Sequence, residues 1–308
     1  MIRTDNLTRD FGNNRGVFDL SLTVSGGEIF GFIGPNGSGK TTTIKMLCGL
    51  LKPTSGTGSI NNIEVNPRNI PQIKKLIGYM PDQFGIYEQM SVWEYLDFFC
   101  AAYRIPSRKR KTRIDEVLEL TEAAYMLDYQ MGSLSHGMNK RIALARILLH
   151  DPEVLIMDEP ANGLDPNGRI EMRKMIMRLR EHGKTIMLSS HILPELSSVC
   201  DRVGIIDKGR LLTQGTVKQI TASLREQVVL SYLIASDREA AAAICKGFAN
   251  VASVSSAGNE IRVVFTGTRD QIADLNRTLI EKGVRVIAVR EEEGDLEEAF
   301  LRVTGHKE

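Results

Sequence analysis

A glycine-rich segment near the start of the chain has the composition and spacing needed to bind phosphate groups. It matches the pattern GxxxxGK[ST] and consists of Gly34, Pro35, Asn36, Gly37, Ser38, Gly39, Lys40 and Thr41, with Thr42 directly after it. The glycines allow successive backbone N–H groups to turn toward phosphate oxygens, and the N-terminus of a following helix adds the positive end of its dipole. In this arrangement Lys40 can reach the β- and γ-phosphates of a nucleotide, and the Thr41 hydroxyl can bind Mg²⁺.

The residues on either side supply the structure that this motif requires. An apolar run from Glu28 to Ile33 predicts a buried strand before it, and a helical pattern from Thr41 to Leu51 follows it. A chain of this length and average composition matches the bare pattern by chance with a probability of about one per cent. The strand and the helix lower that probability further, so we predict a nucleotide-phosphate site that includes Thr42.

Two adjacent carboxylates follow another predicted strand. The apolar run Val154 to Met157 ends in Asp158 and Glu159. Ligands of open α/β sheets bind at the carboxyl ends of the strands, where Asp158 can hold Mg²⁺ and Glu159 can orient and polarise an attacking water. Two acids after a strand are, taken alone, equally consistent with a polar turn. The phosphate-binding segment favours the catalytic interpretation.

A histidine follows a third predicted strand, Thr185 to Ser189. The chain continues there into Ser190 and His191. A lone histidine is more often structural than functional. Because the carboxyl ends of parallel strands meet at one edge of the sheet, we nevertheless predict His191 within reach of the γ-phosphate.

Four further segments make the sequence resemble the ATP-binding cassette (ABC) ATPases. Residues Leu134 to Met138 (LSHGM) resemble the family signature LSGGQ, and Asn162 to Pro166 (NGLDP) resemble its D-loop. His191 matches the family's switch histidine, and Phe11 matches the aromatic residue that stacks on adenine. The order and spacing of these segments agree with the family over residues 1 to about 220.

The resemblance implies a P-loop NTPase that binds and hydrolyses ATP with Mg²⁺. It also implies that two copies, or one copy and a paired cassette, enclose two ATP molecules head to tail. Ser135 and Gly137 of one copy would then contact the ATP held by Lys40 of the other. The YMPD loop, the LSHGM signature and the segment LEEAFL at residues 296–301 resemble those of multidrug and ABC-2-type exporters, which work with separate transmembrane permeases.

Two segments depart from the family pattern. The signature keeps Ser135 and Gly137 but has His136 in place of a glycine and Met138 in place of glutamine. In the loop YMPDQ, Asp82 directly follows the proline, where the family usually has glutamine. We predict that Asp82 is a metal ligand, with Gln83 as the alternative.

The elements that must position these residues alternate between strands and helices. Two more apolar runs, Leu76 to Met80 and Val203 to Asp207, predict core strands. Helical patterns cover Val92 to Tyr103, Lys140 to His150 and Arg169 to His182. The alternation predicts an α/β fold of the P-loop NTPase class, with a doubly wound, mainly parallel sheet. We assign residues 1–224 to this nucleotide-binding domain and residues of about 91–149 to a helical subdomain within it.

The pattern changes after about residue 224, where a small C-terminal domain is expected. Strands are predicted for Gln227 to Ala235, Val251 to Ser255, Glu260 to Phe265 and Val284 to Arg290. Helices are predicted for Asp237 to Phe248, Thr268 to Lys282 and Asp295 to Val303. The order β-α-β-β-α-β plus a helix predicts a ferredoxin-like α+β domain at residues 225–308. A regulatory or dimer-supporting role and a purely stabilising one are equally consistent with it.

Composition and hydropathy limit the classes of protein to which this chain can belong. The net charge of +1, from 39 Lys+Arg and 38 Asp+Glu, argues against nucleic acid as the main partner. No apolar stretch is long enough to cross a bilayer, and the N-terminus lacks the apolar core of a signal peptide. We therefore predict a cytoplasmic protein, peripheral on the cytoplasmic face of the cell membrane through its permease.

The main hypothesis is an export motor subunit, and two alternatives compete with it. Soluble ABC ATPases that act on ribosomes or DNA usually carry two cassettes, a long coiled-coil insert or zinc-binding cysteines, which this sequence lacks. An inactive homologue is disfavoured by the intact Lys40, Asp158, Glu159 and His191. The transported substrate is not encoded in any of these patterns.

Overall fold

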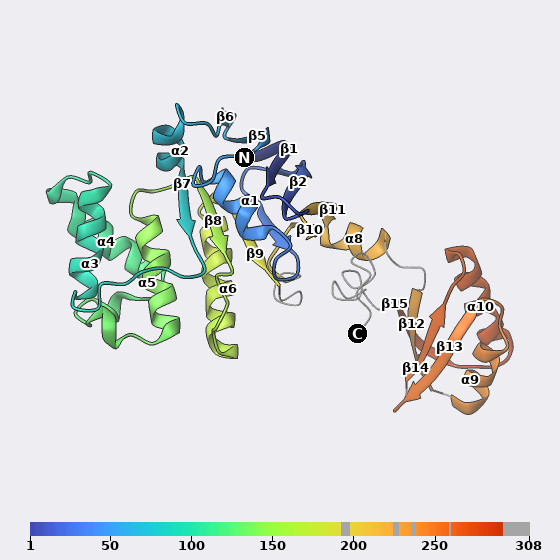
Figure 1. The fold of residues 1–308 in the computed structure, drawn as a ribbon. Coiled ribbons are helices and arrows are strands. Elements are labelled where there is room, and N and C mark those ends of the chain that lie inside the picture. Colours follow the sequence, from blue (N-terminus) through green and yellow to red (C-terminus); the bar gives the residue numbers. More distant parts are fainter. Residues whose placement is uncertain (192–197, 224–227, 236–237, 259, 292–308) are drawn as a thin grey trace. The chain divides into compact units, whose positions relative to one another are not determined.

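The computed structural model describes residues 1–191, 198–223, 228–235, 238–258 and 260–291, drawn in Figure 1. The chain divides into two compact units, Met1–Val217 and Lys218–Glu308. The sequence analysis expects the division near residue 224, whereas the structure has it between Val217 and Lys218. Among the described residues, no helix combines the length and the apolar character needed to cross a membrane.

A six-stranded sheet forms the centre of the first unit. Its order is β11-β10-β4-β9-β8-β7, and every neighbouring pair is parallel except β10 and β11. The strands are β4 (Ile29–Ile33), β7 (Ile77–Met80), β8 (Val154–Asp158), β9 (Thr185–Ser190), β10 (Arg202–Asp207) and β11 (Arg210–Thr216). The five strands predicted from apolar runs are all present, which confirms the mainly parallel α/β class.

Helices lie between and after these strands. They are α1 (Lys40–Leu47), α2 (Ile70–Leu76), α3 (Val92–Ala102), α4 (Ser107–Leu120), α5 (His136–Leu148), α6 (Pro166–Glu181) and α8 (Val217–Ser223). Helix α5 begins earlier than predicted because the Ser135 hydroxyl accepts a hydrogen bond from the Met138 N–H, 3.3 Å away. Helix α1 ends before the predicted Leu51 because Gly49 adopts a left-handed conformation with φ of 67°.

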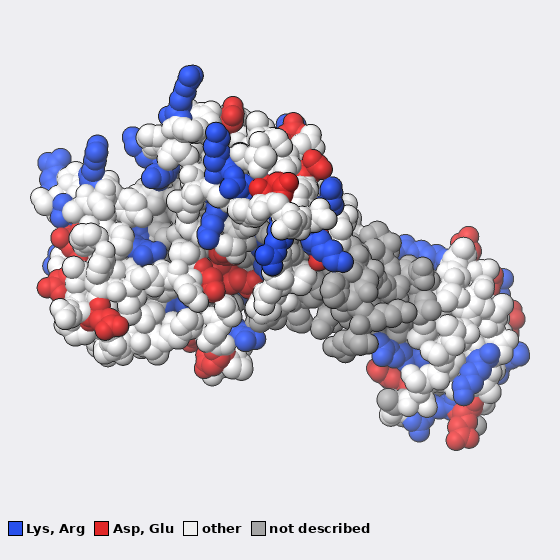
Figure 2. All heavy atoms as spheres, in the orientation of Figure 1, with Lys and Arg blue, Asp and Glu red and all other residues white. Residues whose placement is uncertain are grey.

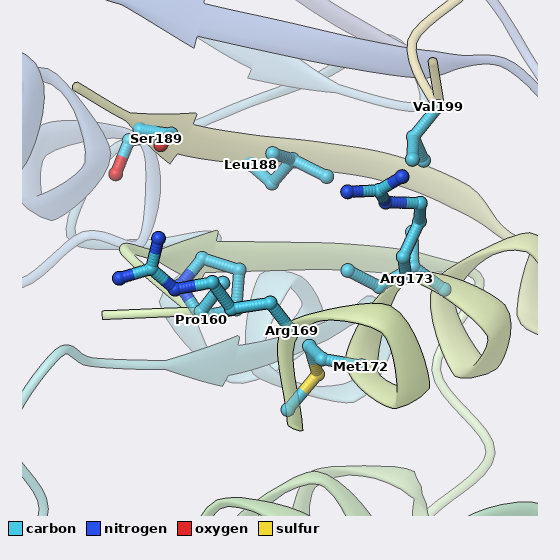
Figure 3. Close-up of a pocket in the computed structure, with 10 residues that line it drawn as sticks. Pro160, Arg169, Met172, Arg173, Leu188, Ser189 and Val199 are labelled. Carbon is cyan, nitrogen blue, oxygen red and sulfur yellow. The ribbon is translucent and has the colours of Figure 1, made fainter. Parts of the chain in front are cut away.

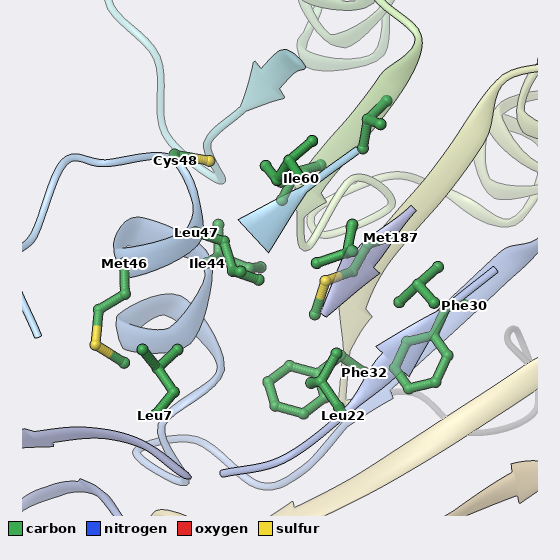
Figure 4. Close-up of a cluster of buried hydrophobic side chains, with 14 of the residues drawn as sticks. Leu7, Leu22, Phe30, Phe32, Ile44, Met46, Leu47, Cys48, Ile60 and Met187 are labelled. Atoms are coloured by element: carbon green, nitrogen blue, oxygen red, sulfur yellow. The ribbon is translucent and has the colours of Figure 1, made fainter. Parts of the chain in front are cut away.

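A second, antiparallel sheet was not predicted from the sequence. It contains β1 (Ile2–Asp10), β2 (Gly16–Leu20), β3 (Thr23–Val24), β5 (Ser55–Ile60) and β6 (Ile63–Glu64). Helix α1 packs against its buried side chains and against those of the central sheet, as Figure 4 shows for Leu7, Ile44, Ile60, Phe32 and Met187. The helix that follows the phosphate-binding segment is therefore held on both sides by apolar packing.

The second unit has its own core and a four-stranded sheet. Its elements are β12 (Val228–Ile234), α9 (Arg238–Lys246), β13 (Val251–Ala257), β14 (Glu260–Phe265), α10 (Arg269–Glu281) and β15 (Val286–Glu291). The sheet order β13-β14-β12-β15, with antiparallel neighbours throughout, is the ferredoxin-like arrangement. The predicted final helix, Asp295 to Val303, lies outside the described residues.

Charged side chains of both signs lie on the face drawn in Figure 2. On the face drawn in Figure 2, the basic and acidic side chains are interspersed. This distribution agrees with the net charge of +1.

A half-buried histidine should make the stability of the first unit depend on pH. His150 Nε2 donates to the Ile77 carbonyl oxygen, 2.9 Å away, and the ring lies against Tyr103. Burial lowers the pKa of His150 below its ordinary value of 6.5. The unfolded chain thus binds a proton at this histidine more readily than the folded chain does. The contribution of His150 to the free energy of unfolding is therefore fully present above pH 6.5 and is lost as the pH falls through that value.

We expect the urea midpoint of the protein to fall between pH 7.5 and 5.5, followed by the fluorescence of the single tryptophan, Trp93. His150→Gln keeps an N–H donor for Ile77 but cannot titrate, so its midpoint should fall less over the same range. Equal losses in both proteins would show that His150 does not contribute.

Candidate active site

An open cleft of about 740 Å³ lies beside the phosphate-binding segment. It brings together residues that are far apart in the sequence. The predicted site residues that line it are Phe11, Asn36, Gly37, Gly39, Lys40, Thr41, Thr42, Asp82, Glu159 and His191. Phe11 follows β1 (Ile2–Asp10), and the others follow the ends of β4, β7, β8 and β9, as expected for a ligand site at the carboxyl edge of a parallel sheet.

The backbone of the phosphate-binding segment depends on glycine. Gly37 and Gly39 have φ of 81° and 112°, which residues with a side chain rarely adopt. A Cβ atom on Gly34 would lie 2.4 Å from the carbonyl oxygen of Ile206, so the segment also needs glycine for close packing. Lys40 Nζ donates to the carbonyl oxygens of Gly34 and Pro35, at 2.7 and 3.3 Å.

The N-terminus of α1 forms one wall of the cleft. Its N-cap, Gly39, has no side chain with which to accept a hydrogen bond from the first turn. The first N–H groups of a helix lack partners within the helix itself. Because Lys40, Thr41 and Thr42 all line the cleft, this end of α1 suits an anion such as a phosphate group.

Asp158 is buried and held by two hydroxyl groups. The Thr41 hydroxyl donates to its Oδ2 atom at 2.7 Å, and the Ser189 hydroxyl donates to its Oδ1 atom at 2.6 Å. The side chain of Asp158 is only 2% exposed. A carboxylate and a hydroxyl from two distant segments therefore lie side by side, as the sequence analysis expects, while Ser189 was missed.

The carboxylate of Glu159 lies between the side chains of Lys40 and His191. Its Oε1 atom is 3.3 Å from Lys40 Nζ, and its Oε2 atom is 2.9 Å from His191 Nδ1. The backbone of Glu159 has a φ of 50°, an unusual conformation for a residue with a side chain. Glu159 thus contacts both of the other residues predicted to be catalytic, Lys40 and His191.

Asp82 lines the cleft, but one of its carboxylate oxygens already has protein partners. The Asn162 side-chain amide donates to Asp82 Oδ1 at 3.1 Å, and Lys140 Nζ lies 3.5 Å from the same atom. Burial lowers the pKa of Lys140. The sequence analysis noted Asn162 only as part of the D-loop and did not assign any role to Lys140.

Phe11 projects at the mouth of the cleft and is 54% exposed. The guanidinium of Arg9 lies 4.9 Å from the centre of its ring. An exposed aromatic face next to a phosphate-binding segment suits stacking on a nucleotide base. Asn14, Arg15 and Lys208 also line the cleft and were not predicted, because they belong to no recognisable motif.

Ser135 and Gly137 lie in a different cleft of about 470 Å³, formed by the beginnings of α5 and α6. Within one chain they do not line the cleft of Lys40. His136 Nε2 lies 3.1 Å from the Asn162 carbonyl oxygen, so this substituted signature residue contacts the D-loop. The structure therefore separates two predicted parts of the nucleotide site.

A third cavity, of about 30 Å³, lies between α6 and the end of β9, and Figure 3 shows it. The labelled residues around it include Pro160, Met172, Leu188 and Val199. Its volume is that of about one water molecule. It is far too small for a nucleotide, unlike the cleft beside the phosphate-binding segment.

Comparisons with known proteins decide the family. Residues 17–162 match the family model described as ABC transporter. The chain is 36% identical over 306 residues to the bacitracin transport ATP-binding protein BcrA of Bacillus licheniformis, covering 99% of this chain and 97% of that protein. The chain belongs to the ABC transporter ATP-binding proteins.

Two further matches agree with this family. The chain is 35% identical to the Nod factor export ATP-binding protein I of Cupriavidus metallidurans, over 72% of this chain and 73% of that one. The solved structure of cbiO1 from Clostridium perfringens, part of the ABC transporter complex cbiONQ, matches with a TM-score of 0.65 and 28% identity. That match covers 72% of this chain and 90% of cbiO1.

Membership of the family gives the protein its activity. The protein is an ABC ATPase: it binds a nucleotide and hydrolyses ATP as a subunit of a transporter. The alignment with BcrA extends over almost the whole chain, whereas the match with cbiO1 does not. The C-terminal unit is therefore shared with some members of the family.

Proposed function

We propose that this ABC ATPase drives export through a separate transmembrane permease, on the cytoplasmic face of the membrane. The observation that carries the proposal is the convergence of Lys40, Glu159 and His191 in one cleft, beside the Thr41–Asp158 pair. The direction of transport follows the relatives, which are named for bacitracin transport and for Nod factor export.

The chain's own residues account for an in-line attack of water on the γ-phosphate, without a covalent enzyme intermediate. Glu159 orients and polarises the water, and its contacts with Lys40 and His191 hold the carboxylate in place. Lys40 balances negative charge on the β- and γ-phosphates, and the amides at the start of α1 bind the phosphate oxygens. Phe11 stacks on the adenine.

Mg²⁺ fits the donor atoms beside the phosphate-binding segment. Thr41 and Asp158 offer oxygen atoms within 2.7 Å of each other, and Mg²⁺ prefers oxygen ligands. We propose that these two residues hold the ion, with Asp82 supplying a further oxygen. When bound, Mg²⁺ neutralises charge on the phosphates.

The separation of the two clefts favours a dimer that ATP holds together. Ser135 and Gly137 of one copy would complete the site around Lys40 of the other, which one chain cannot do by itself. Glu159→Gln protein should sediment as a monomer without nucleotide and as a dimer with saturating Mg-ATP, because the ligand forms part of the interface.

Analytical ultracentrifugation measures the dimer population. Ser135→Ala is the matched change in the cleft that contains Ser135 and Gly137. Its hydroxyl caps α5. Ser135→Ala in the Glu159→Gln background should weaken the dimer while nucleotide binding persists. A wild-type protein that is fully active but stays monomeric at saturating ATP would contradict the arrangement. If the purified chain by itself has only weak ATPase activity, it pairs with a different cassette.

An exposed aromatic surface is the proposed contact with the permease. Tyr87 is 50% exposed and packs edge-on against Phe98, with ring centres 5.6 Å apart. Both residues follow the loop that contains Asp82. A partner bound to them would therefore contact a segment that continues directly from a residue of the nucleotide cleft. Aromatic side chains of this kind are typical of protein interfaces.

Copurification and reconstitution test the proposed function. The tagged chain, isolated from solubilised membranes, should retain a membrane protein, and the reconstituted pair should hydrolyse ATP and move a substrate out. Tyr87→Ala should keep the ATPase activity of the free subunit but lose the membrane protein. If wild-type protein retains none, or retains ribosomes instead, the export proposal is wrong.

The C-terminal unit is proposed to support the dimer or the coupling to transport. All residues of the nucleotide cleft lie in Met1–Val217. A chain that ends after Leu224 should therefore bind ATP with unchanged affinity, measured by titration with a fluorescent nucleotide. Its dimer population or transport rate should fall, and unchanged values for both would leave the unit a stabilising role only.

A further inference from the structure

Lys140 in helix α5 is a fully buried lysine whose side chain is 0% exposed. An ammonium group without partners is very costly to bury, so its surroundings must satisfy it. Its Nζ atom donates to the carbonyl oxygen of Asp82 at 3.0 Å and to that of Glu159 at 3.3 Å. The carboxylate of Asp82 lies 3.5 Å from the same nitrogen.

These contacts join three separate segments of the chain. Lys140 belongs to the helix whose first turn follows the signature residue Ser135. Asp82 follows β7 and lines the nucleotide cleft, and Glu159 follows β8. One ammonium group therefore connects the signature helix with two residues of the other cleft.

The contact with Glu159 acts on a strained backbone. With a φ of 50°, Glu159 needs support from its neighbours to keep this conformation. Its N–H donates to the Ser189 hydroxyl at 3.0 Å, and its carbonyl oxygen accepts from the Asn162 N–H at 3.1 Å as well as from Lys140. Lys140 thus helps to fix the main chain from which the Glu159 carboxylate projects.

We propose that Lys140 is a positioning residue for hydrolysis: it couples the signature helix to Asp82 and to the catalytic Glu159. The inference rests on the proposed role of Glu159. Because Lys140 does not line the nucleotide cleft, its loss should misplace the carboxylate without removing any contact to the nucleotide. A small misplacement of a catalytic group costs about tenfold to a hundredfold in rate.

Lys140→Met tests this in the full-length chain, because methionine has a similar length but cannot donate. We expect kcat for ATP to fall at least tenfold, while KM and the affinity for a fluorescent ATP analogue change less than twofold. Lys140→Gln keeps an N–H donor for one carbonyl oxygen, so it should recover part of kcat. Ile147→Ala, in the buried face of the same helix, is the control for lost stability.

Ile147→Ala should lower Tm but leave kcat per folded protein unchanged. The inference is wrong if Lys140→Met keeps a normal kcat, or if Ile147→Ala loses kcat in proportion to Tm as Lys140→Met does. Should Lys140→Met fail to fold, Lys140→Gln tests the inference by itself: its kcat should still be below that of the wild type, because one amide cannot replace all the contacts of the ammonium group, and a wild-type kcat would contradict the inference. Glu159→Gln, assayed alongside, separates the two hypotheses: its full activity would overturn the role of Glu159 itself.

Discussion

Replacing Glu159 with Gln should slow ATP hydrolysis by at least about a hundredfold to ten-thousandfold, the usual contribution of a positioned general base. The amide has the shape of the carboxylate but cannot accept a proton from water. It can still accept a hydrogen bond from Lys40 or His191, which contact the two oxygens of the carboxylate at 3.3 and 2.9 Å. Nucleotide affinity should therefore stay within a few fold of wild type.

Steady-state ATPase assays and equilibrium nucleotide titrations on the same preparations measure the two quantities separately. His191→Ala is the matched variant, because it removes the partner of Oε2 and leaves the carboxylate in place. It should reduce kcat less than Glu159→Gln does. Near-normal turnover of Glu159→Gln would show that another group activates the water.

Replacing Lys40 with Ala should weaken ATP binding by tenfold or more, because the variant loses a charge-assisted contact worth about 1.5–3 kcal/mol. The side chain of Lys40 is only 6% exposed and is surrounded by the carbonyl oxygens of Gly34 and Pro35 and the Glu159 carboxylate. Hydrolysis should also be lost, since both Lys40 and the water-activating residue act on the γ-phosphate.

Lys208 provides the control for Lys40, because it lines the same cleft but belongs to the turn between β10 and β11. Lys208→Ala should weaken nucleotide binding far less. Titration with labelled ATP gives both affinities. If the two variants bind ATP equally well, the phosphate contact does not depend on Lys40.

The arrangement of the candidate site could be predicted because it depends on short, contiguous motifs. Local structure can be predicted for the segment around Lys40 and for the run that ends in Asp158 and Glu159. In both places a strand, a turn and a helix follow one another directly in the sequence. The edge of a parallel sheet then brings such segments together. His191 was placed by the same argument and lies beside Glu159.

Other features depended on long-range contacts that no local pattern reveals. The antiparallel sheet pairs β1 with β5, whose sequence SGTGSI lacks the apolar alternation of a strand. From the sequence alone, Lys140 is an ordinary charged residue of a predicted helix. In the structure it is buried, and its ammonium group contacts Asp82 and Glu159. Its position follows from tertiary packing, which overrides the local preference of lysine for the surface.

The division of the chain was harder to place than its elements. Helix α8 (Val217–Ser223) continues the first unit's pattern in the sequence, but the structure assigns residues from Lys218 onward to the second unit. The ferredoxin-like order was predictable, because turn and capping signals separate several of its strands and helices. Thr268 and Gln271, for example, form a capping box at the start of α10.

The left-handed backbone of Glu159 has a consequence for how this protein can evolve. That conformation costs about 1–2 kcal/mol in a residue with a side chain, and glycine adopts it freely. Glycine at this position would relieve the backbone cost, but the carboxylate and its contacts with Lys40 and His191 would be lost with it. The chain therefore carries a conformational cost at the residue that we propose as the base, and ATP turnover is the function that this cost would serve.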